Sequence, residues 1–111
     1  MYRISKRMEI AAAHRLNLPY ESKCVNLHGH NYIVTVFCKA QELNSQGMVV
    51  DFAKVKKEIH EILDHHYLND ILGGLNPTAE NMAKWICDQV PYCYKVEVQE
   101  SEGNIATYER D

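Results

Sequence analysis

Apolar and polar residues alternate along the first fourteen positions of the chain. The apolar set is Tyr2, Ile4, Met8, Ile10 and Ala12, interrupted by Lys6, and the polar set is Arg3, Ser5, Arg7 and Glu9. A period of two predicts a β-strand over residues 2–14 with one buried face. His14 continues the apolar parity, so its imidazole is expected to point inward. Residues 15–27 have a loop composition.

A second alternating segment covers residues 28–40. One parity holds His28, His30, Tyr32, Val34, Val36 and Cys38. Because side chains two apart on a strand share a face, His28 and His30 are predicted to point to the same side. Residues 41–47 form a polar turn, and the two strands are expected to pair in antiparallel fashion.

From Asp51 the apolar spacing becomes helical. Phe52, Val55, Ile59, Ile62 and Leu63 form one stripe, which predicts a helix that begins after an Asp51 cap and ends near residues 64–67. Gly73, Gly74 and Pro77 mark a loop. Thr78 is expected to cap a second helix, which Pro91 ends and whose stripe is Ala79, Met82, Ala83, Ile86 and Val90.

Two further strands complete the prediction. Tyr94, Val96 and Val98 alternate with polar residues, residues 101–104 turn the chain, and residues 105–110 return. The order β-β-α-α-β-β predicts an α+β fold, a four-stranded antiparallel sheet with both helices on one face, in a single domain over residues 1–111. Such a sheet leaves one face and two edges uncovered, which favours a homo-oligomer.

Composition narrows the possible partners and the compartment. The 111 residues carry a net charge of -3, with 46% hydrophobic and 24% charged residues, as in ordinary globular proteins. Neither a nucleic acid nor a membrane is indicated as a partner, and we expect a cytoplasmic protein. Of the four cysteines, Cys38 and Cys87 fit buried apolar positions, whereas Cys24 lies among polar residues near potential metal ligands.

His14, His28 and His30 are candidate metal ligands. Each alone is more typical of a hydrogen-bonded structural histidine, but two adjacent antiparallel strands bring all three together. Three imidazoles with one open coordination position are typical of catalytic zinc sites. The competing interpretation is a closed structural site in which Cys24 is the fourth ligand.

Asp64, His65 and Glu100 are further candidates. Asp64-His65 ends the first predicted helix. One interpretation is a solvated helix terminus, where histidine interacts favourably with the helix dipole. The other is that His65 carries protons and is oriented by the neighbouring Asp64 carboxylate. Glu100 has the parity of the apolar face of its strand, so its carboxylate must be paired or must meet a ligand with adjacent N–H donors. The alternative is a strand-end glutamate that turns into solvent.

Several motifs together resemble the 6-pyruvoyltetrahydropterin synthase superfamily over essentially the whole chain. They are Ala12-Ala13-His14-Arg15-Leu16, Cys24-x-x-x-His28-Gly29-His30-Asn31-Tyr32, Val50-Asp51-Phe52, Leu63-Asp64-His65-x-x-Leu68-Asn69, Asn76-Pro77-Thr78-x-Glu80-Asn81 and Glu100. The three residues between Cys24 and His28 resemble the 6-carboxytetrahydropterin synthase branch, which acts in queuosine synthesis.

The resemblance implies a tunnelling fold in which subunits assemble as trimers or hexamers with active sites between them. It implies that zinc is bound by His14, His28 and His30 and that Cys24 is the general base. Asp64 and His65 would relay protons, Glu100 would anchor the pterin during catalysis, and Thr78 would help to hold it.

The implied substrate is 7,8-dihydroneopterin triphosphate, and the implied products are 6-carboxytetrahydropterin, acetaldehyde and triphosphate. Two alternatives stay open at this point. One is a 6-pyruvoyltetrahydropterin synthase, which eliminates triphosphate without cleaving a carbon–carbon bond. The other is a non-catalytic, zinc-stabilised pterin-binding protein.

Overall fold

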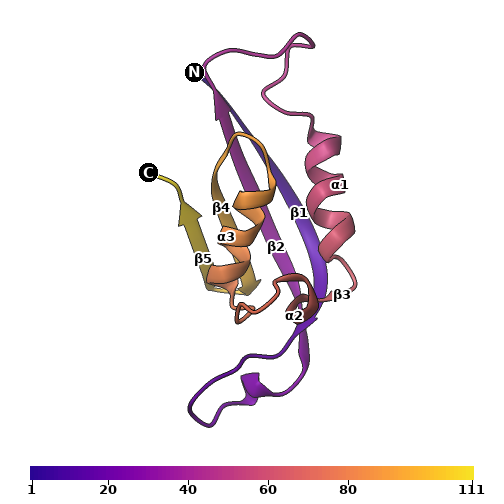
Figure 1. Ribbon diagram of the computed structural model, residues 1–111, viewed down its shortest axis with the longest axis vertical. Coiled ribbons are helices and arrows are strands. Elements are labelled where there is room, and N and C mark those ends of the chain that lie inside the picture. Colours follow the sequence, from indigo (N-terminus) through magenta and orange to yellow (C-terminus); the bar gives the residue numbers. More distant parts are fainter.

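A computed structural model describes residues 1–111 and contains one mixed sheet with its helices on one side (Figure 1). The strand order across the five-stranded sheet is β3-β1-β2-β4-β5. In chain order the elements are β1 (Tyr2–His14), the 3-10 turn η1 (Lys23–Val25), β2 (His28–Ala40), α1 (Phe52–Leu63), β3 (His66–Tyr67), α2 (Leu68–Ile71), α3 (Ala79–Gln89), β4 (Cys93–Ser101) and β5 (Asn104–Glu109).

The predicted α+β class and the order of the main elements are confirmed. Three elements were missed: the turn η1 in the predicted loop, β3, which runs parallel to β1 and pairs with it only at Ala12 and Ala13, and the short α2 that follows. The sheet therefore has five strands instead of the predicted four. A two-residue strand is too short to leave a periodic pattern in a sequence.

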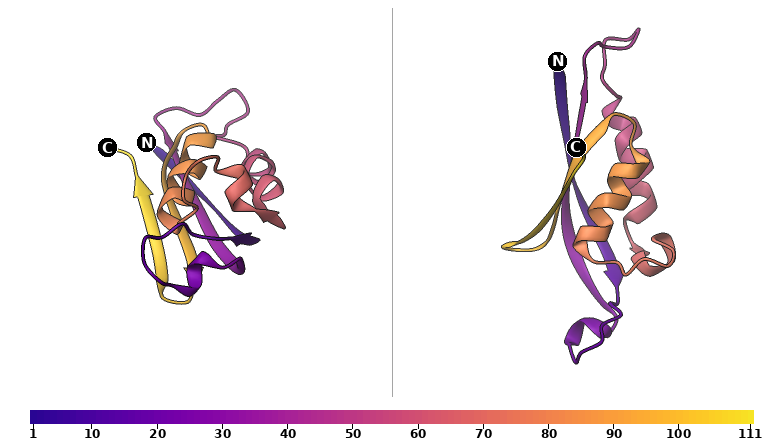
Figure 2. Two further views of the ribbon diagram at one scale, coloured as in Figure 1. Left: turned by 60° about the horizontal axis from the view of Figure 1, so that its bottom comes forward. Right: turned by 60° about the vertical axis from the view of Figure 1, so that its left-hand side comes forward.

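The long β1–β2 pair determines which side chains face the helices. Its antiparallel register is continuous from Tyr2 opposite Ala40 to His14 opposite His28. Even-numbered residues of both strands therefore share the face that α1 and α3 cover, while the opposite face has no helix on it (Figure 2). A cluster of 23 buried residues fills the space between the sheet and the helices.

Two predicted apolar faces differ in detail. Tyr94 was expected inside with Val96 and Val98, but the β2–β4 register shifts between Phe37 and Cys38, so Cys93 is buried and Tyr94 packs against Phe37 on the open face. A β-bulge of this kind reverses the side-chain alternation on one side of it. On α1, Phe52 and Ile62 are exposed, because the buried stripe is narrower than predicted.

Side chains cap both long helices as predicted. The Asp51 carboxylate accepts a hydrogen bond from the Ala53 amide, and the Thr78 hydroxyl accepts one from the Asn81 amide. No helix here has both the length and the apolar character that a membrane span needs. The short α2 and the loop that leads to α3 lie beside the end of the sheet at which β1 stops and β2 begins (Figure 1).

Candidate metal centre and its surroundings

Three histidines converge where β1 ends and β2 begins. The register places His14 opposite His28 and His30 opposite Ala12, so all three rings lie on the helix-facing side. Ring centroids are 4.5 Å apart for His14 and His28, 5.2 Å for His14 and His30, and 4.9 Å for His28 and His30. One nitrogen from each residue lies within 4.8 Å of the others. The predicted grouping is confirmed.

Two backbone carbonyls fix the tautomer of two rings in this cluster. His14 Nδ1 lies 2.8 Å from the Pro77 carbonyl oxygen, and His28 Nδ1 lies 2.7 Å from that of Asn26. Because a carbonyl oxygen only accepts, both Nδ1 atoms donate, and each neutral ring then carries its lone pair on Nε2. Those two Nε2 atoms face each other at 2.9 Å. Two opposed lone pairs at this distance require a cation or a proton between them.

The third histidine presents a buried nitrogen without a hydrogen-bond partner. His30 Nε2 lies 3.3 Å from a carboxylate oxygen of Glu100, but the pair does not have the alignment of a hydrogen bond. A buried unpartnered polar atom is costly in a folded protein, which makes it a marker of a missing ligand. The nearby carboxylate adds negative charge beside the cluster, and this charge favours a cation.

Burial keeps His14 in the form that a metal needs. The residue is fully buried, and this desolvation lowers its pKa below the ordinary value of 6.5. Tyr32 lies beneath it, with its hydroxyl oxygen 3.2 Å from His14 Nδ1, and burial raises the pKa of Tyr32 so that its hydroxyl stays protonated. Three imidazoles, two of them oriented by backbone carbonyls, form a donor set that fits a transition-metal ion.

Cys24 does not belong to the cluster of possible ligands in this chain. It lies in η1, where its amide donates to the Ser22 hydroxyl, and its thiol is free and half-buried. No hydrogen bond joins its side chain to the histidines or to His65. The arrangement favours three ligands with an open position over a closed four-ligand site.

Asp64 and His65 lie where α1 gives way to β3. One oxygen of Asp64 accepts a hydrogen bond from the Ala11 amide at 2.8 Å, and the other lies 3.5 Å from His65 Nε2 and 3.7 Å from His60 Nε2. The carboxylate is therefore fixed to β1 while it faces two imidazoles. The expected neighbourhood of Asp64 and His65 is present, and His60 shares it.

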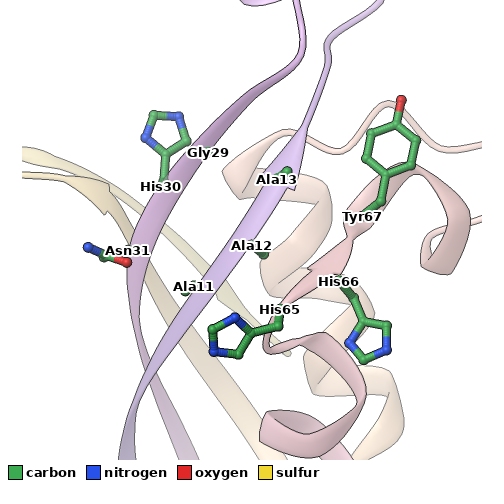
Figure 3. A pocket seen from close by; sticks show the side chains of 9 residues that line it. All are labelled: Ala11, Ala12, Ala13, Gly29, His30, Asn31, His65, His66 and Tyr67. Atoms are coloured by element: carbon green, nitrogen blue, oxygen red, sulfur yellow. The ribbon is translucent and has the colours of Figure 1, made fainter.

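The backbone of His65 is in the left-handed region. Its φ is +60°, and its amide donates to the Ala11 carbonyl at 2.6 Å. Residues with side chains rarely adopt this conformation, which is usual for glycine just after a helix end. His65 and Tyr67, together with Ala11–Ala13, line a groove of about 530 Å³ that reaches His30 on the neighbouring strand (Figure 3).

Glu100 lies in the bulge between β4 and β5, where the register skips from Gln99 to Ser101. Its carboxylate is half-buried between His30 and a second cavity of about 370 Å³ near the start of α3. Thr78 caps α3 with its hydroxyl, so its capping role is confirmed. The Glu100 carboxylate therefore lies between the histidine cluster and this second cavity.

Sequence reasoning missed the groups that orient the ligands. Tyr32 shares the parity of His28 and His30, and this signal could have identified it. The carbonyls of Asn26 and Pro77 left no such signal, because any residue supplies a carbonyl and only the folded path of the chain directs it.

Comparisons with known proteins agree with this geometry. The model of the family described as 6-pyruvoyl tetrahydropterin synthase matches residues 3–111. A 6-carboxy-5,6,7,8-tetrahydropterin synthase of Synechocystis sp. is 37% identical over 97% of this chain and 93% of its own length. The 6-pyruvoyl tetrahydrobiopterin synthase of Homo sapiens is 35% identical over 95% of this chain and 89% of its own length.

The fold gives the same result. The structure of a 6-pyruvoyl tetrahydropterin synthase from Caenorhabditis elegans superposes with a TM-score of 0.78 at 29% identity, and the match covers 99% of this chain and 96% of the other. The full-length matches in sequence and structure, together with the histidine cluster, lead to one conclusion: the chain belongs to the 6-pyruvoyl tetrahydropterin synthase family.

Proposed function

We propose that this protein is a zinc-dependent carbon–carbon lyase of queuosine biosynthesis. It would convert 7,8-dihydroneopterin triphosphate and one water into 6-carboxy-5,6,7,8-tetrahydropterin, acetaldehyde and triphosphate. The relative from Synechocystis sp. that bears the 6-carboxytetrahydropterin synthase name supports this choice, since it matches nearly the whole chain. Free thiols agree with the cytoplasm as the compartment.

The observation that carries the proposal is the facing pair of Nε2 lone pairs on His14 and His28, beside the unpartnered nitrogen of His30. These three imidazoles would hold Zn²⁺. The bound ion would supply Lewis acidity, which lowers the pKa of the substrate's side-chain hydroxyls. The carbonyls of Pro77 and Asn26 hold the rings of His14 and His28 in the required tautomer.

Proton transfer would fall to Cys24, Asp64 and His65. Cys24 as thiolate would remove a proton from a side-chain carbon of the substrate, and a thiol needs a nearby base or cation to act in this way. His65, held beside the Asp64 carboxylate, would supply or remove the compensating proton. General acid–base groups of this kind contribute about 100- to 10,000-fold each to the rate.

Glu100 would orient the pterin. A carboxylate accepts two parallel hydrogen bonds, and the amino-pyrimidine edge of a pterin presents adjacent N–H donors. Its position between His30 and the cavity at the start of α3 would direct the pterin side chain toward the metal. Thr78 lies at that helix start and would help to hold the ring, although its hydroxyl also caps the helix.

We also propose that the active site forms between copies in a trimer or hexamer. No hydrogen bond joins Cys24 to His65 within one chain, and the side chain of His65 is 82% exposed. The helix-free sheet face and the unpaired edges of β1 and β5 are surfaces that a second copy would cover. Cys24 of one copy would then face His65 of another.

Incubation of the purified protein with 7,8-dihydroneopterin triphosphate, with and without a chelator, tests the proposal. We expect 6-carboxytetrahydropterin and acetaldehyde by mass spectrometry, and we expect both to disappear after zinc removal. Formation of 6-pyruvoyltetrahydropterin without acetaldehyde would instead assign the activity named for the Homo sapiens relative.

A Cys24→Ala variant separates the enzyme from a zinc-stabilised binding protein. We expect stoichiometric zinc and no turnover, because the thiol lies outside the ligand cluster. His28→Ala is the matched control and should lose the metal. If Cys24→Ala also lost the metal, Cys24 would be the fourth ligand and the site would be structural.

A further inference from the structure

Two asparagines hold the chain where it leaves β1. The side-chain oxygen of Asn69 accepts from the Arg15 amide at 3.0 Å, and its nitrogen donates to the Arg15 carbonyl at 2.9 Å. Asn76 does the same with Asn17, at 2.8 Å and 3.1 Å. Each amide thus satisfies both backbone groups of one residue.

This pattern imitates the edge of a neighbouring strand. In an antiparallel ladder, residues two apart direct their N–H and C=O groups to the same side, and each hydrogen-bonded pair exchanges two bonds. Arg15 and Asn17 are two apart and face the two asparagines. β3 pairs with β1 only as far as Ala13, so the two side chains continue its edge beyond the point where β3 turns into α2.

The opposite edge of the same segment holds Cys24. Between Arg15 and Asn17, the Leu16 amide points the other way and donates to the Cys24 carbonyl at 2.7 Å. The Cys24 amide in turn donates to the Ser22 hydroxyl at 3.2 Å. The backbone of Cys24 is therefore bonded directly to a segment that the two asparagines fix from the other side.

Asn76 also connects this segment to the metal centre. Its own carbonyl accepts from the Thr78 amide and from the side chain of Asn81, both at 2.8 Å, which anchors it to the start of α3. The next carbonyl, that of Pro77, orients the ring of His14. One dipeptide thus sets the direction of a metal ligand and the position of the loop that bears Cys24.

We propose that Asn69 and Asn76 are positioning residues that hold the Cys24 loop in place relative to the three histidines. This inference rests on the proposed function, in which Cys24 is the base. Neither asparagine touches the reacting atoms. Both act through the backbone of residues 15–17, and their bonds lie at the surface, where they add little to the core.

The test compares Asn69→Ala and Asn76→Ala with Asn44→Ala, all in the zinc-loaded protein. Asn44 is the matched control, because its side chain also accepts from backbone amides, those of Gln46 and Met48, but in the loop at the other end of the molecule. Amide exchange of Leu16 and the alkylation rate of Cys24 are measured with zinc content, kcat and KM.

We expect the rate of amide exchange at Leu16 to rise about tenfold in Asn69→Ala and in Asn76→Ala. The loss of one or two hydrogen bonds changes a local opening equilibrium by about this factor. The alkylation rate of Cys24 should change with it, zinc should stay stoichiometric, and kcat should fall more than KM changes. The Asn44 variant should match the wild type. Unchanged exchange and alkylation in both Asn69→Ala and Asn76→Ala would overturn the proposal.

Asn69→Asp and Asn76→Asp keep the test decisive if an alanine variant fails to fold. Aspartate retains the acceptor for the backbone amide but loses the donor, so an intermediate increase in exchange is expected. The two proposals also fail separately. If the wild type shows no turnover but Leu16 exchange is altered in the variants, only the proposed lyase activity is rejected. If the wild type is active but Leu16 exchange is unaltered in the variants, only the positioning role of Asn69 and Asn76 is rejected.

Discussion

Replacing His65 with glycine should change the stability of the protein little while it sharply reduces turnover. The backbone of His65 has φ of +60°, which costs a residue with a side chain about 1–2 kcal/mol and glycine almost nothing. The greater freedom of glycine in the unfolded chain returns about 0.5–1 kcal/mol of that gain. Since 82% of the side chain is exposed, its removal loses little burial, and its contact with Asp64 is worth less than about 1 kcal/mol.

Together these effects leave a change in the free energy of unfolding between about -1 and about +1.5 kcal/mol, and a melting temperature within about 6 °C of the wild type. Turnover should fall about 100- to 10,000-fold, because the proton carrier is gone. Thermal unfolding and product formation measure the two effects on the same preparation.

Tyr92→Gly is the matched control. Tyr92 is the other residue with a side chain in the left-handed region, with φ of +65°, and it is 64% exposed in the turn before β4. Its free energy of unfolding should change by a similarly small amount, and it should keep full activity. The reasoning is refuted if His65→Gly lowers the free energy of unfolding by more than about 1 kcal/mol, or if that variant remains active.

Three further outcomes follow from the structure. Removal of zinc should lower the melting temperature by about 10 °C, since a ligand at 100 times its Kd adds about 2.7 kcal/mol; an equal melting temperature with and without chelator would contradict a bound metal. Native protein should expose one reactive thiol, that of Cys24, and unfolded protein four, because the other cysteines are buried and burial raises the pKa of Cys87 to about 12. Asp88→Asn should reduce the free energy of unfolding at pH 7 by less than about 1 kcal/mol, because the side chain is exposed. The hydrogen bond from Lys84 holds the pKa of Asp88 below 3.8. The stability that the Asp88 carboxylate contributes is therefore present above that pH and is lost as the pH falls through the folded-state pKa. Urea unfolding of the wild type and Asp88→Asn at pH 7 and pH 2 should show that their difference in free energy of unfolding vanishes in acid.

The grouping of the three histidines could be predicted from parity alone, and the reason is geometric. Once residues 2–14 and 28–40 alternate, every side chain of the same parity lies on the same face, so His14, His28 and His30 had to share a side. The turn between the strands, however long, does not change this. Glu100 was identified by the same rule, as a charged residue that continues an apolar face.

What the sequence did not reveal depends on contacts between distant segments. β3 exists because Asp64 and His65 bond to Ala11, not because of any pattern in its two residues. Asparagine is common in turns, so the sequence alone gives no sign of the role of Asn69 and Asn76. That role depends on Arg15 and Asn17, which lie opposite them only in the folded chain. Tyr94 faced the wrong way in the prediction because a bulge at Cys38 leaves no mark on a single strand.

Because Asn69 and Asn76 bond to residues that are distant in the sequence, insertions near them should be tolerated less well than insertions elsewhere in the chain. Residues added between Asn69 and Asn76 would move both amides relative to Arg15 and Asn17, and with them the carbonyl that orients His14. The connection between β2 and α1 is different, since the backbone bonds of Asn44 in that loop go to nearby Gly47 and Met48. An engineer who wishes to add a fluorescent label or a purification tag inside the chain should therefore place it beside Ser45.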